Sequence, residues 1–442
     1  MSLISPRVLK GFRDTLPESE LVRRTLTSHL ESAFRRFGYV PIDTPTLEYT
    51  EVLLGKGGGE TDKQVFRFTD HGGRDVSMRF DLTVPFARYM AAHLGELYTP
   101  FRRYHIGKAW RGENTQRGRY REFVQCDFDI VGVDSASADA DTLLTAIEAF
   151  RVLGVERVRL HVAHRGLFNR FLSTLGVVEK SGDILRTVDK LRKTGRDKTE
   201  ADLTSLVGSE TARRILEYVT ADGPADDVID SIETLAGGPA EDTQRIRAVF
   251  SALEETGAGE MVVYDPSITR GLDYYTGLVF ETFLEDLPEI GSVCSGGRYN
   301  DLASLYTRQE LPGVGGSVGL DRLLAALEQL EQGPKAVRAT DILVFCFDEA
   351  LLGYYHRLAR DLRAAGFSTE VYPEAKKLGQ QFTYAEKKGI PIAVICGPDE
   401  KEAGRINCKD LRTRESFQAS GVPTAVEEIS RRLGAHATRS TL

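Results

Sequence analysis

Hydrophobic positions in the first eighty residues predict a helix followed by short strands. Apolar residues recur at helical spacing over residues 18–37, so we expect an amphipathic helix that ends at Gly38. Residues 39–45 contain two prolines, which cannot donate ladder hydrogen bonds, and this segment is predicted to be an edge strand or a strand at an interface. Residues 65–68 and 76–80 alternate on either side of a glycine-containing turn, which is typical of a hairpin.

A second hairpin is predicted from residues 104–111 and 122–131, which alternate strongly around a polar connector. In the returning strand Gln125, Asp127 and Asp129 lie two residues apart, so their side chains share one face. A row of one amide and two carboxylates is costly to bury without polar partners. The pattern therefore predicts the floor of a ligand site.

The character of the chain changes over residues 165–256, where strand patterns vanish and modest apolar stripes at helical spacing take their place. We interpret this segment as a helical insertion between two parts of one catalytic domain, residues 1–164 and 257–332. Residues 338–434 then alternate between strand and helix patterns, which predicts a small parallel or mixed α/β domain.

Composition indicates a globular protein of two or three domains. The chain has 442 residues, of which 41% are hydrophobic. Its apolar runs are shorter than the roughly 20 residues that span a bilayer, and its first residues lack the apolar stretch of a signal peptide. The five cysteines are odd in number and widely spaced, with no CxxC pair, which argues against a disulfide framework or zinc site. We expect a cytoplasmic protein with no membrane partner.

Charge limits the nucleic-acid partners. The formal net charge is 57 minus 65, or −8, which argues against a surface coated in basic charge for DNA. The connector of the second hairpin nevertheless carries Arg117, Arg119 and Arg121, close to Arg111. The planar guanidinium fork suits phosphate, so this tip fits a triphosphate or an RNA backbone. A solvated, charged hairpin tip is the alternative.

Three glycine-bearing segments are further candidates for contact with a ligand: residues 270–277, 294–300 and 313–322. Glycine permits close backbone approach to a ligand or to another strand. Taken alone, the first fits a tight loop equally well, and the second fits a plain turn better. The third, a glycine-rich stretch that leads into a predicted helix, is too weak a signal by itself for a nucleotide site. The histidines show no metal-ligand spacing.

Together these segments resemble histidyl-tRNA synthetases over almost the whole chain. Residues 38–48 are similar to class II motif 1, residues 110–113 (WRGE) to motif 2 and residues 319–322 (GLDR) to motif 3. The runs RGLDYYTG from Arg270 and SGGRY from Ser295 are more specific to the family. The resemblance implies an α+β fold: a mainly antiparallel sheet of the class II synthetase type flanked by helices, a helical insertion and a C-terminal α/β anticodon-binding domain.

The resemblance also implies a reaction: histidine–tRNA ligation, in which L-histidine is activated with ATP and Mg²⁺ to histidyl-adenylate and then transferred to tRNA(His). By match of position, Asp81, Thr83 and Gln125 would bind the ammonium group, and Asp129 and Tyr275 the imidazole nitrogens. The full set that it assigns to histidine is Asp81, Leu82, Thr83, Gln125, Asp129, Tyr274 and Tyr275.

For ATP the resemblance implies Arg111 at the α-phosphate, Glu113 at the adenine amino group and Arg322 at the γ-phosphate. Arg270 and Arg111 would be the catalytic groups, on opposite sides of the α-phosphate. The residues that it places at the tRNA acceptor end are Gln116, Arg117 and Arg119. Motif 1 further implies a homodimer.

Two alternative functions are known for proteins that resemble these synthetases. Synthetase-like regulatory subunits of histidine biosynthesis assist ATP phosphoribosyltransferase, and other proteins use a synthetase fold only as an interaction module. Such paralogues erode the ATP arginines and lack the anticodon domain, whereas this chain keeps both. It departs from the family pattern at Asn300, where aspartate is usual, and at Gly112, which replaces a larger residue.

Overall fold

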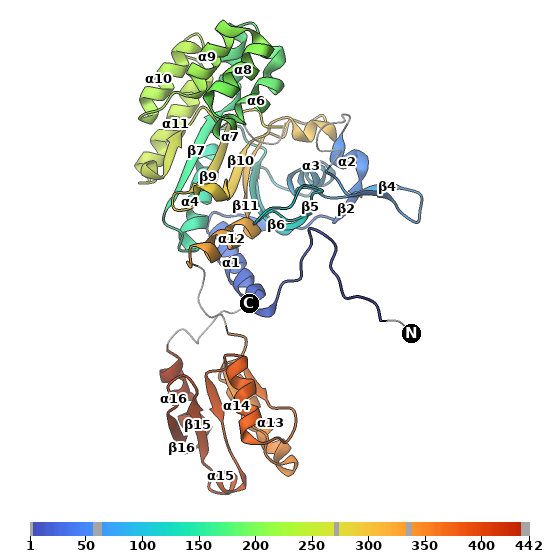
Figure 1. The fold of residues 1–442 in the computed structure, drawn as a ribbon, viewed down its shortest axis with the longest axis vertical. Coiled ribbons are helices and arrows are strands. Elements are labelled where there is room, and N and C mark those ends of the chain that lie inside the picture. Colours follow the sequence, from blue (N-terminus) through green and yellow to red (C-terminus); the bar gives the residue numbers. More distant parts are fainter. Residues whose placement is uncertain (1–2, 56–63, 269–273, 333–337, 435–442) are drawn as a thin grey trace. The chain divides into compact units, whose positions relative to one another are not determined.

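The computed structural model describes residues 3–55, 64–268, 274–332 and 338–434 (Figure 1). The chain forms two compact units. The larger consists of Met1–Thr15 with Arg23–Gly333, and the smaller of Leu16–Val22 with Pro334–Leu442. Within the described residues no helix combines the length and apolarity that a membrane crossing requires.

The larger unit is built on an eight-stranded sheet in the order β1-β5-β6-β11-β10-β9-β7-β8. Its inner pairs are antiparallel, and only the outermost pairs, β1 with β5 and β7 with β8, are parallel. The mainly antiparallel sheet predicted from the resemblance is thus confirmed. The strands are β1 (Val40–Pro41), β5 (Phe101–Trp110), β6 (Glu122–Val131), β7 (Val158–His164), β8 (Val262–Tyr264), β9 (Leu278–Leu284), β10 (Cys294–Arg298) and β11 (Gly313–Gly319).

Two glycine-rich segments form the middle of this sheet. Strand β10, for which the sequence favoured a turn, pairs with β9 and β11, and β11 in turn pairs with β6. The turn interpretation of residues 294–298 was therefore wrong. Small residues leave no alternating hydrophobic pattern, although these strands are as central as the predicted ones.

Helices pack beside the large sheet. The first, α1 (Pro17–Arg36), ends just before Gly38, whose φ of 79° suits a glycine at a helix end. Phe34 of α1 packs on Phe128 of β6, with ring centroids 5.3 Å apart. The other helices beside the sheet are α3 (Thr83–Ala92), α4 (Ala136–Val152) and α12 (Leu320–Gln329), with short 3-10 turns η4 (Pro288–Ile290) and η5 (Leu302–Leu305).

A small separate sheet forms where the first hairpin was predicted. Strands β3 (Arg67–Thr69) and β4 (Asp75–Met78) are antiparallel, and β2 (Leu47–Tyr49) joins the other edge of β4. A short helix, α2 (Thr50–Leu54), follows β2 directly.

The helical insertion lies between the parallel strands β7 and β8, and Figure 1 shows its helices gathered beyond one end of the sheet. The sequence predicted its helical character but not β7, which precedes it. The elements are α5 (Arg165–Thr174), η2 (Val178–Lys180), α6 (Ser181–Val188), α7 (Leu191–Thr194), α8 (Arg196–Val207), α9 (Ser209–Val219), α10 (Ala225–Leu235), α11 (Glu241–Glu255) and η3 (Gly259–Met261).

The smaller unit contains a five-stranded sheet in the order β13-β12-β14-β15-β16. Strand β12 is parallel to both neighbours, and the remaining pairs are antiparallel, so the mixed α/β domain is confirmed. Its elements are β12 (Ile342–Val344), η6 (Glu349–Leu351), α13 (Leu352–Ala364), β13 (Thr369–Val371), α14 (Leu378–Lys387), β14 (Ile392–Val394), α15 (Pro398–Glu402), β15 (Ile406–Asp410), β16 (Ser416–Ala419) and α16 (Val422–Leu433).

Candidate active site

A cavity of about 360 Å³ opens over strands β6, β10 and β11 of the large sheet. It collects side chains from segments that are more than two hundred residues apart in the sequence. The predicted site residues that line it are Thr83, Arg111, Glu113, Arg119, Gln125, Asp129, Tyr274, Tyr275 and Arg322. Such a cavity, with a few convergent polar groups, is the usual form of a small-molecule site.

The floor of the cavity is the polar face of β6. The side-chain amide of Gln125 donates to Ser317 Oγ over 3.1 Å, and Asp129 accepts a hydrogen bond from the hydroxyl of Tyr299. Thr83 Oγ1 donates to Asp127 Oδ2 over 3.5 Å. The row of acids expected from the alternation of β6 is therefore in place, and Asp127 and Asp129 are only 1% and 2% exposed.

Sequence reasoning missed the cation that balances this floor. Arg103 lies opposite Asp129 in the β5–β6 register and is fully buried. Its Nη2 lies 2.7 Å from Asp129 Oδ2 and 3.7 Å from Asp127 Oδ2. The guanidinium carbon also lies 4.2 Å from the ring centroid of Phe86. One buried guanidinium thus serves two buried carboxylates.

Burial changes the acidity of the carboxyl groups around the cavity. It raises the pKa of Asp129 to about 7, although Arg103 opposes the shift. It likewise raises the pKa of Asp81 to about 6, where the backbone N–H of Val84 and the positive charge of Arg111 act in the opposite direction. Removal from water disfavours the charged form, so both groups favour a ligand that brings positive charge or hydrogen-bond donors.

Several buried acceptors on this floor lack a donor. Among the described residues Gln125 Oε1 and Asp127 Oδ1 have no hydrogen-bond partner, and Asp129 Oδ2 has only the ion-pair contact with Arg103, outside hydrogen-bond geometry. A buried polar atom without a partner costs free energy. A ligand that carries N–H donors would remove this cost.

Two tyrosines also line the cavity. The hydroxyl of Tyr274 lies 3.4 Å from Asp81 Oδ2, and the Tyr274 and Tyr275 rings meet edge to face at 5.1 Å. Asp81 and Leu82 themselves are buried and are not among the residues that line the cavity. The carbonyl oxygen of Leu82 accepts a bond of 3.4 Å from Arg103.

Glycines in β10 and β11 allow this close packing. A Cβ at Gly315 would collide with the carboxylate of Asp129. A Cβ at Gly297 would lie 2.7 Å from the carbonyl oxygen of Leu278 and 2.9 Å from the Tyr275 ring. Glycine is therefore required at both places to bring the carboxylate and the tyrosine up to the sheet.

Two arginines form the basic part of the cavity. Arg111 donates from Nε to the carbonyl oxygen of Phe80 over 2.9 Å, and its Nη1 lies 3.8 Å from Glu113 Oε1. Arg322, in the first turn of α12, donates to the carbonyl oxygen of Ser292. Both guanidinium groups line the cavity together with the acidic floor.

An N-terminal arginine that the sequence did not single out also braces this basic part. Arg13 forms an ion pair with Asp321 and lies 4.0 Å from the ring centroid of Tyr120. Asp321 also accepts the backbone N–H of Val124 over 2.7 Å. Asp321 therefore links α12, β6 and the N-terminal segment beside Arg322.

The structure separates the remaining predicted residues. Gln116 and Arg117 line a second cavity of about 390 Å³, which Arg119 also reaches. Arg192 and Lys193 of the helical insertion also line this second cavity. Arg270, predicted to be catalytic, lies outside the described residues.

These features define a class II aminoacyl-tRNA synthetase: the mainly antiparallel sheet, the α/β unit, and a cavity lined by buried acids and by the arginines Arg111 and Arg322. A sequence model of the family described as "Histidyl-tRNA synthetase" matches residues 11–323. A second model, described as "Anticodon binding domain", matches residues 341–432. The chain belongs to the histidyl-tRNA synthetase family.

Individual relatives agree along almost the full length. The chain is 53% identical to the histidine–tRNA ligase of Treponema denticola over 93% of its own length and 95% of that protein. It is 47% identical to the histidine–tRNA ligase of Rhodopirellula baltica, over 94% and 95% of the two chains. The crystal structure of the histidyl-tRNA synthetase from Nostoc sp. PCC 7120 matches with a TM-score of 0.86 at 30% identity, covering 97% of this chain and 100% of the other.

Proposed function

We propose that the chain activates L-histidine with ATP to histidyl-adenylate and then transfers the histidyl group to tRNA(His). The observation that carries this function is the polarity of the cavity in a member of this family. Its floor offers buried carboxylate and amide oxygens, and its lining also includes the guanidinium groups of Arg111 and Arg322. An amino acid with an ammonium and an imidazole group fits the first, and a triphosphate fits the second.

The floor would recognise histidine by hydrogen bonds. Asp81, Thr83 and Gln125 hold the ammonium group, and Asp129 and Tyr275 hold the two imidazole nitrogens. The buried acceptors on β6 support this assignment because a side chain without N–H groups would leave them unpaired. A site built on such hydrogen bonds rejects analogues that lack them by about 10⁴–10⁵-fold.

ATP would bind beside the cavity-lining arginines Arg111 and Arg322. There a carboxylate oxygen of histidine attacks the α-phosphorus and pyrophosphate leaves. Arg111 holds the α-phosphate, Arg322 the γ-phosphate and Glu113 the adenine amino group, and Arg270 acts from the other side of the α-phosphate. Preorganised positive groups are the main help that such a step needs, and losing one costs about 2.7–4 kcal/mol.

Mg²⁺ would accompany ATP. It prefers phosphate and carboxylate oxygens and neutralises charge on the phosphates during the transfer. Glu113, at the cavity wall, is one carboxylate within this region. The described part of the chain holds no cluster of three acidic, histidine or cysteine side chains of the kind that binds a metal without phosphates.

The tRNA would meet two regions. Gln116, Arg117 and Arg119 contact its acceptor end, and the α/β unit over residues 338–434 contacts the anticodon. Lys377 and Lys387, exposed at either end of α14, are candidates for this anticodon contact. Lys388 is also exposed, but it pairs with Glu370 and donates to the hydroxyl of Tyr384. Residues 1–164 and 257–332 would together form the catalytic domain around the insertion 165–256.

We also propose a cytoplasmic homodimer. Leu47, Tyr49 and Phe68 of the small sheet are 45–51% exposed, which leaves an apolar edge that a second copy could cover. All five cysteines are free and buried, as expected in a reducing compartment. Light scattering should give twice the mass of one chain, and a monomeric mass would contradict the dimer.

The decisive assay is histidine-dependent exchange of pyrophosphate into ATP, followed by charging of tRNA(His). The proposed function requires both activities, and Arg111→Ala should lower the exchange rate about 100-fold or more. A regulatory subunit of ATP phosphoribosyltransferase would bind histidine without supporting either reaction. Absence of exchange in the unaltered protein would reject the proposal.

A further inference from the structure

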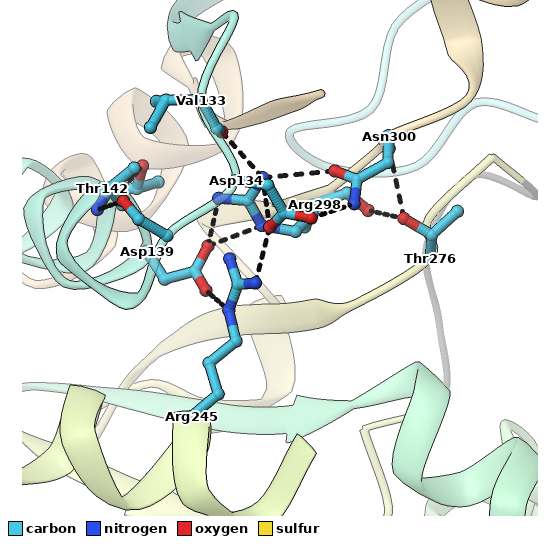
Figure 2. A network of polar contacts seen from close by, with 10 residues as sticks. Val133, Asp134, Asp139, Thr142, Arg245, Thr276, Arg298 and Asn300 are labelled. Carbon is cyan, nitrogen blue, oxygen red and sulfur yellow. Dashed lines mark hydrogen bonds and ion pairs between the residues drawn. The ribbon is translucent and has the colours of Figure 1, made fainter. Parts of the chain in front are cut away.

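One arginine of helix α11, in the helical insertion, pairs with two carboxylates on and just before α4. Arg245 donates from Nε to Asp139 Oδ2 over 2.7 Å and from Nη1 to Asp134 Oδ1 over 2.5 Å (Figure 2). Asp139 lies on α4 and is completely buried. A buried carboxylate of this kind requires a fixed cationic partner.

The same carboxylate holds a second arginine, which belongs to the central strand β10. Arg298 is 2% exposed and donates from Nε to Asp139 Oδ1 over 2.8 Å. Its Nη1 donates to the side-chain oxygen of Asn300 over 3.2 Å. Asp139 therefore connects an arginine of the insertion to an arginine of the catalytic sheet, as Figure 2 shows.

The connection continues through the backbone to the tyrosine pair. The carbonyl oxygen of Arg298 accepts the N–H of Thr276 over 2.7 Å, and Thr276 Oγ1 accepts the N–H of Asn300 over 3.1 Å. Thr276 directly follows Tyr275, whose ring packs on Gly297 in β10. The position of Tyr275 in the cavity thus depends on where β10 and Arg298 are held.

Asn300 closes the network with an amide where the family usually has aspartate. Its Nδ2 donates to Asp134 Oδ2 over 2.9 Å while its Oδ1 accepts from Arg298. An amide can donate and accept at once, whereas a carboxylate would face Asp134 with like charge. With an amide at Asn300, the two positive charges of Arg245 and Arg298 balance the two negative charges of Asp134 and Asp139. Burial opposes ionisation of Asp134, yet its pKa is lowered because Arg245 and Arg298 stabilise the anion.

We propose that Arg245 is a positioning residue for the segment Tyr274–Thr276, and that the helical insertion thereby sets the affinity for histidine. Arg245 does not line the cavity and acts through Asp139 and Asp134, which hold Arg298 and Asn300. The inference rests on the proposed function, because histidine is the ligand whose binding it affects. Arg111, which would contact ATP, is held by the carbonyl oxygen of Phe80 and lies beside Glu113, so ATP affinity should not depend on Arg245.

Arg245→Gln tests the inference, with Arg247→Gln as the matched control. Arg247 lies on the same helix but pairs with Asp230 inside the insertion, over 2.5 Å. In histidine-dependent pyrophosphate exchange, Arg245→Gln should raise KM for histidine about tenfold, within the range of coupled neighbours. KM for ATP should stay within twofold. The control should leave both constants within twofold.

A double-mutant cycle with Thr276→Val separates positioning from general destabilisation. If Arg245 acts through Thr276, the two substitutions together should raise KM for histidine much less than the product of their separate effects. Simple loss of folded enzyme lowers kcat and leaves both KM values unchanged. Asn300→Ala, which removes no charge, should raise KM for histidine in the same direction and serves if Arg245→Gln does not fold.

Unchanged KM for histidine in Arg245→Gln and Asn300→Ala, or multiplicative effects in the cycle, would overturn the positioning role while leaving the proposed function intact. An equal rise in KM for ATP would also overturn it. Absence of exchange in the unaltered enzyme would reject the proposed function, and with it the inference.

Discussion

Replacing Arg103 by methionine tests whether one guanidinium balances the acidic floor of the site. Methionine keeps an apolar chain against the Phe86 ring but removes the charge that lies 2.7 Å from Asp129 and 3.7 Å from Asp127. Both carboxylates remain buried without a cation. Removing one partner of a buried ion pair costs about 3–5 kcal/mol in the free energy of unfolding. That is a large share of the roughly 5–15 kcal/mol that stabilises a typical domain.

The cost should depend on pH in a defined direction. Burial raises the pKa of Asp129 to about 7 even with Arg103 present, and the pKa should rise further without it. A carboxyl group whose pKa is higher in the folded than in the unfolded state contributes stability below its unfolded pKa of about 4. That contribution is lost as the pH rises through the folded pKa. The variant should therefore be least stable, relative to the unaltered protein, at alkaline pH.

Urea denaturation at pH 6, 7 and 8 measures this difference. The loss in Arg103→Met should grow mainly above pH 7, by up to about 1.4 kcal/mol per pH unit for each carboxyl group that is protonated in the folded variant but ionised in the folded unaltered protein. Arg102→Met is the matched control, because Arg102 pairs with Asp141 over 2.5 Å with both side chains about one-third exposed. It should cost about 1 kcal/mol or less, without a pH trend. Equal losses in the two variants, or a loss in Arg103→Met that ignores pH, would refute the reasoning.

Two other predictions concern substrate binding. Gly315→Ala should destabilise the protein by about 1–3 kcal/mol and raise KM for histidine in pyrophosphate exchange, because its Cβ displaces Asp129. In the control Gly353→Ala, at a position in helix α13, a Cβ meets nothing within 4 Å, so this change should stabilise the protein by up to about 1 kcal/mol and leave KM unchanged. Equal behaviour of the two variants would contradict the assignment. Lys377→Glu combined with Lys387→Glu should leave exchange unaltered but weaken tRNA charging and flatten its salt dependence by about one counterion for each lysine, and unchanged charging kinetics would argue against an anticodon contact at α14.

Local periodicity was sufficient for the parts of the site that lie on one element. The β5–β6 hairpin and the common face of Gln125, Asp127 and Asp129 follow from alternation within ten residues. The helical insertion and the α/β unit were also predicted, since their patterns extend over many turns. These features depend on the order of residues along the chain and not on distant partners.

Contacts across strands could not be read in the same way. Arg103 is one of many arginines in the sequence, and only the β5–β6 register places it opposite Asp129. The hydroxyl of Tyr299 reaches Asp129 from 170 residues away. The first contact requires the exact register of β5 against β6, which alternation alone does not give. The second requires the pairing of glycine-rich β10 and β11, which a hydrophobic pattern does not reveal. The sequence therefore indicated the acids of the floor but neither of the groups that hold them.

Glycine explains the main error in the predicted fold. Strands β10 and β11 carry Gly296, Gly297, Gly315 and Gly316, so they show little of the alternation that marks a strand. Their lack of side chains is what admits the ring of Phe280 and the carboxylate of Asp129. The property that concealed these strands in the sequence is the one that creates space for the cavity.

The distribution of charge in the cavity suggests how the site orders its two small substrates. Asp81 and Asp129 are buried with raised pKa values, so the ammonium group at Asp81 and an imidazole N–H at Asp129 would stabilise their ionised forms. Arg111 and Arg322 line the same cavity, where they would repel the ammonium group and attract phosphates. A histidine bound in reverse would place its carboxylate beside acids and its ammonium beside arginines. These charges would thus set the direction in which the histidine carboxylate faces the α-phosphate, before any catalytic group acts.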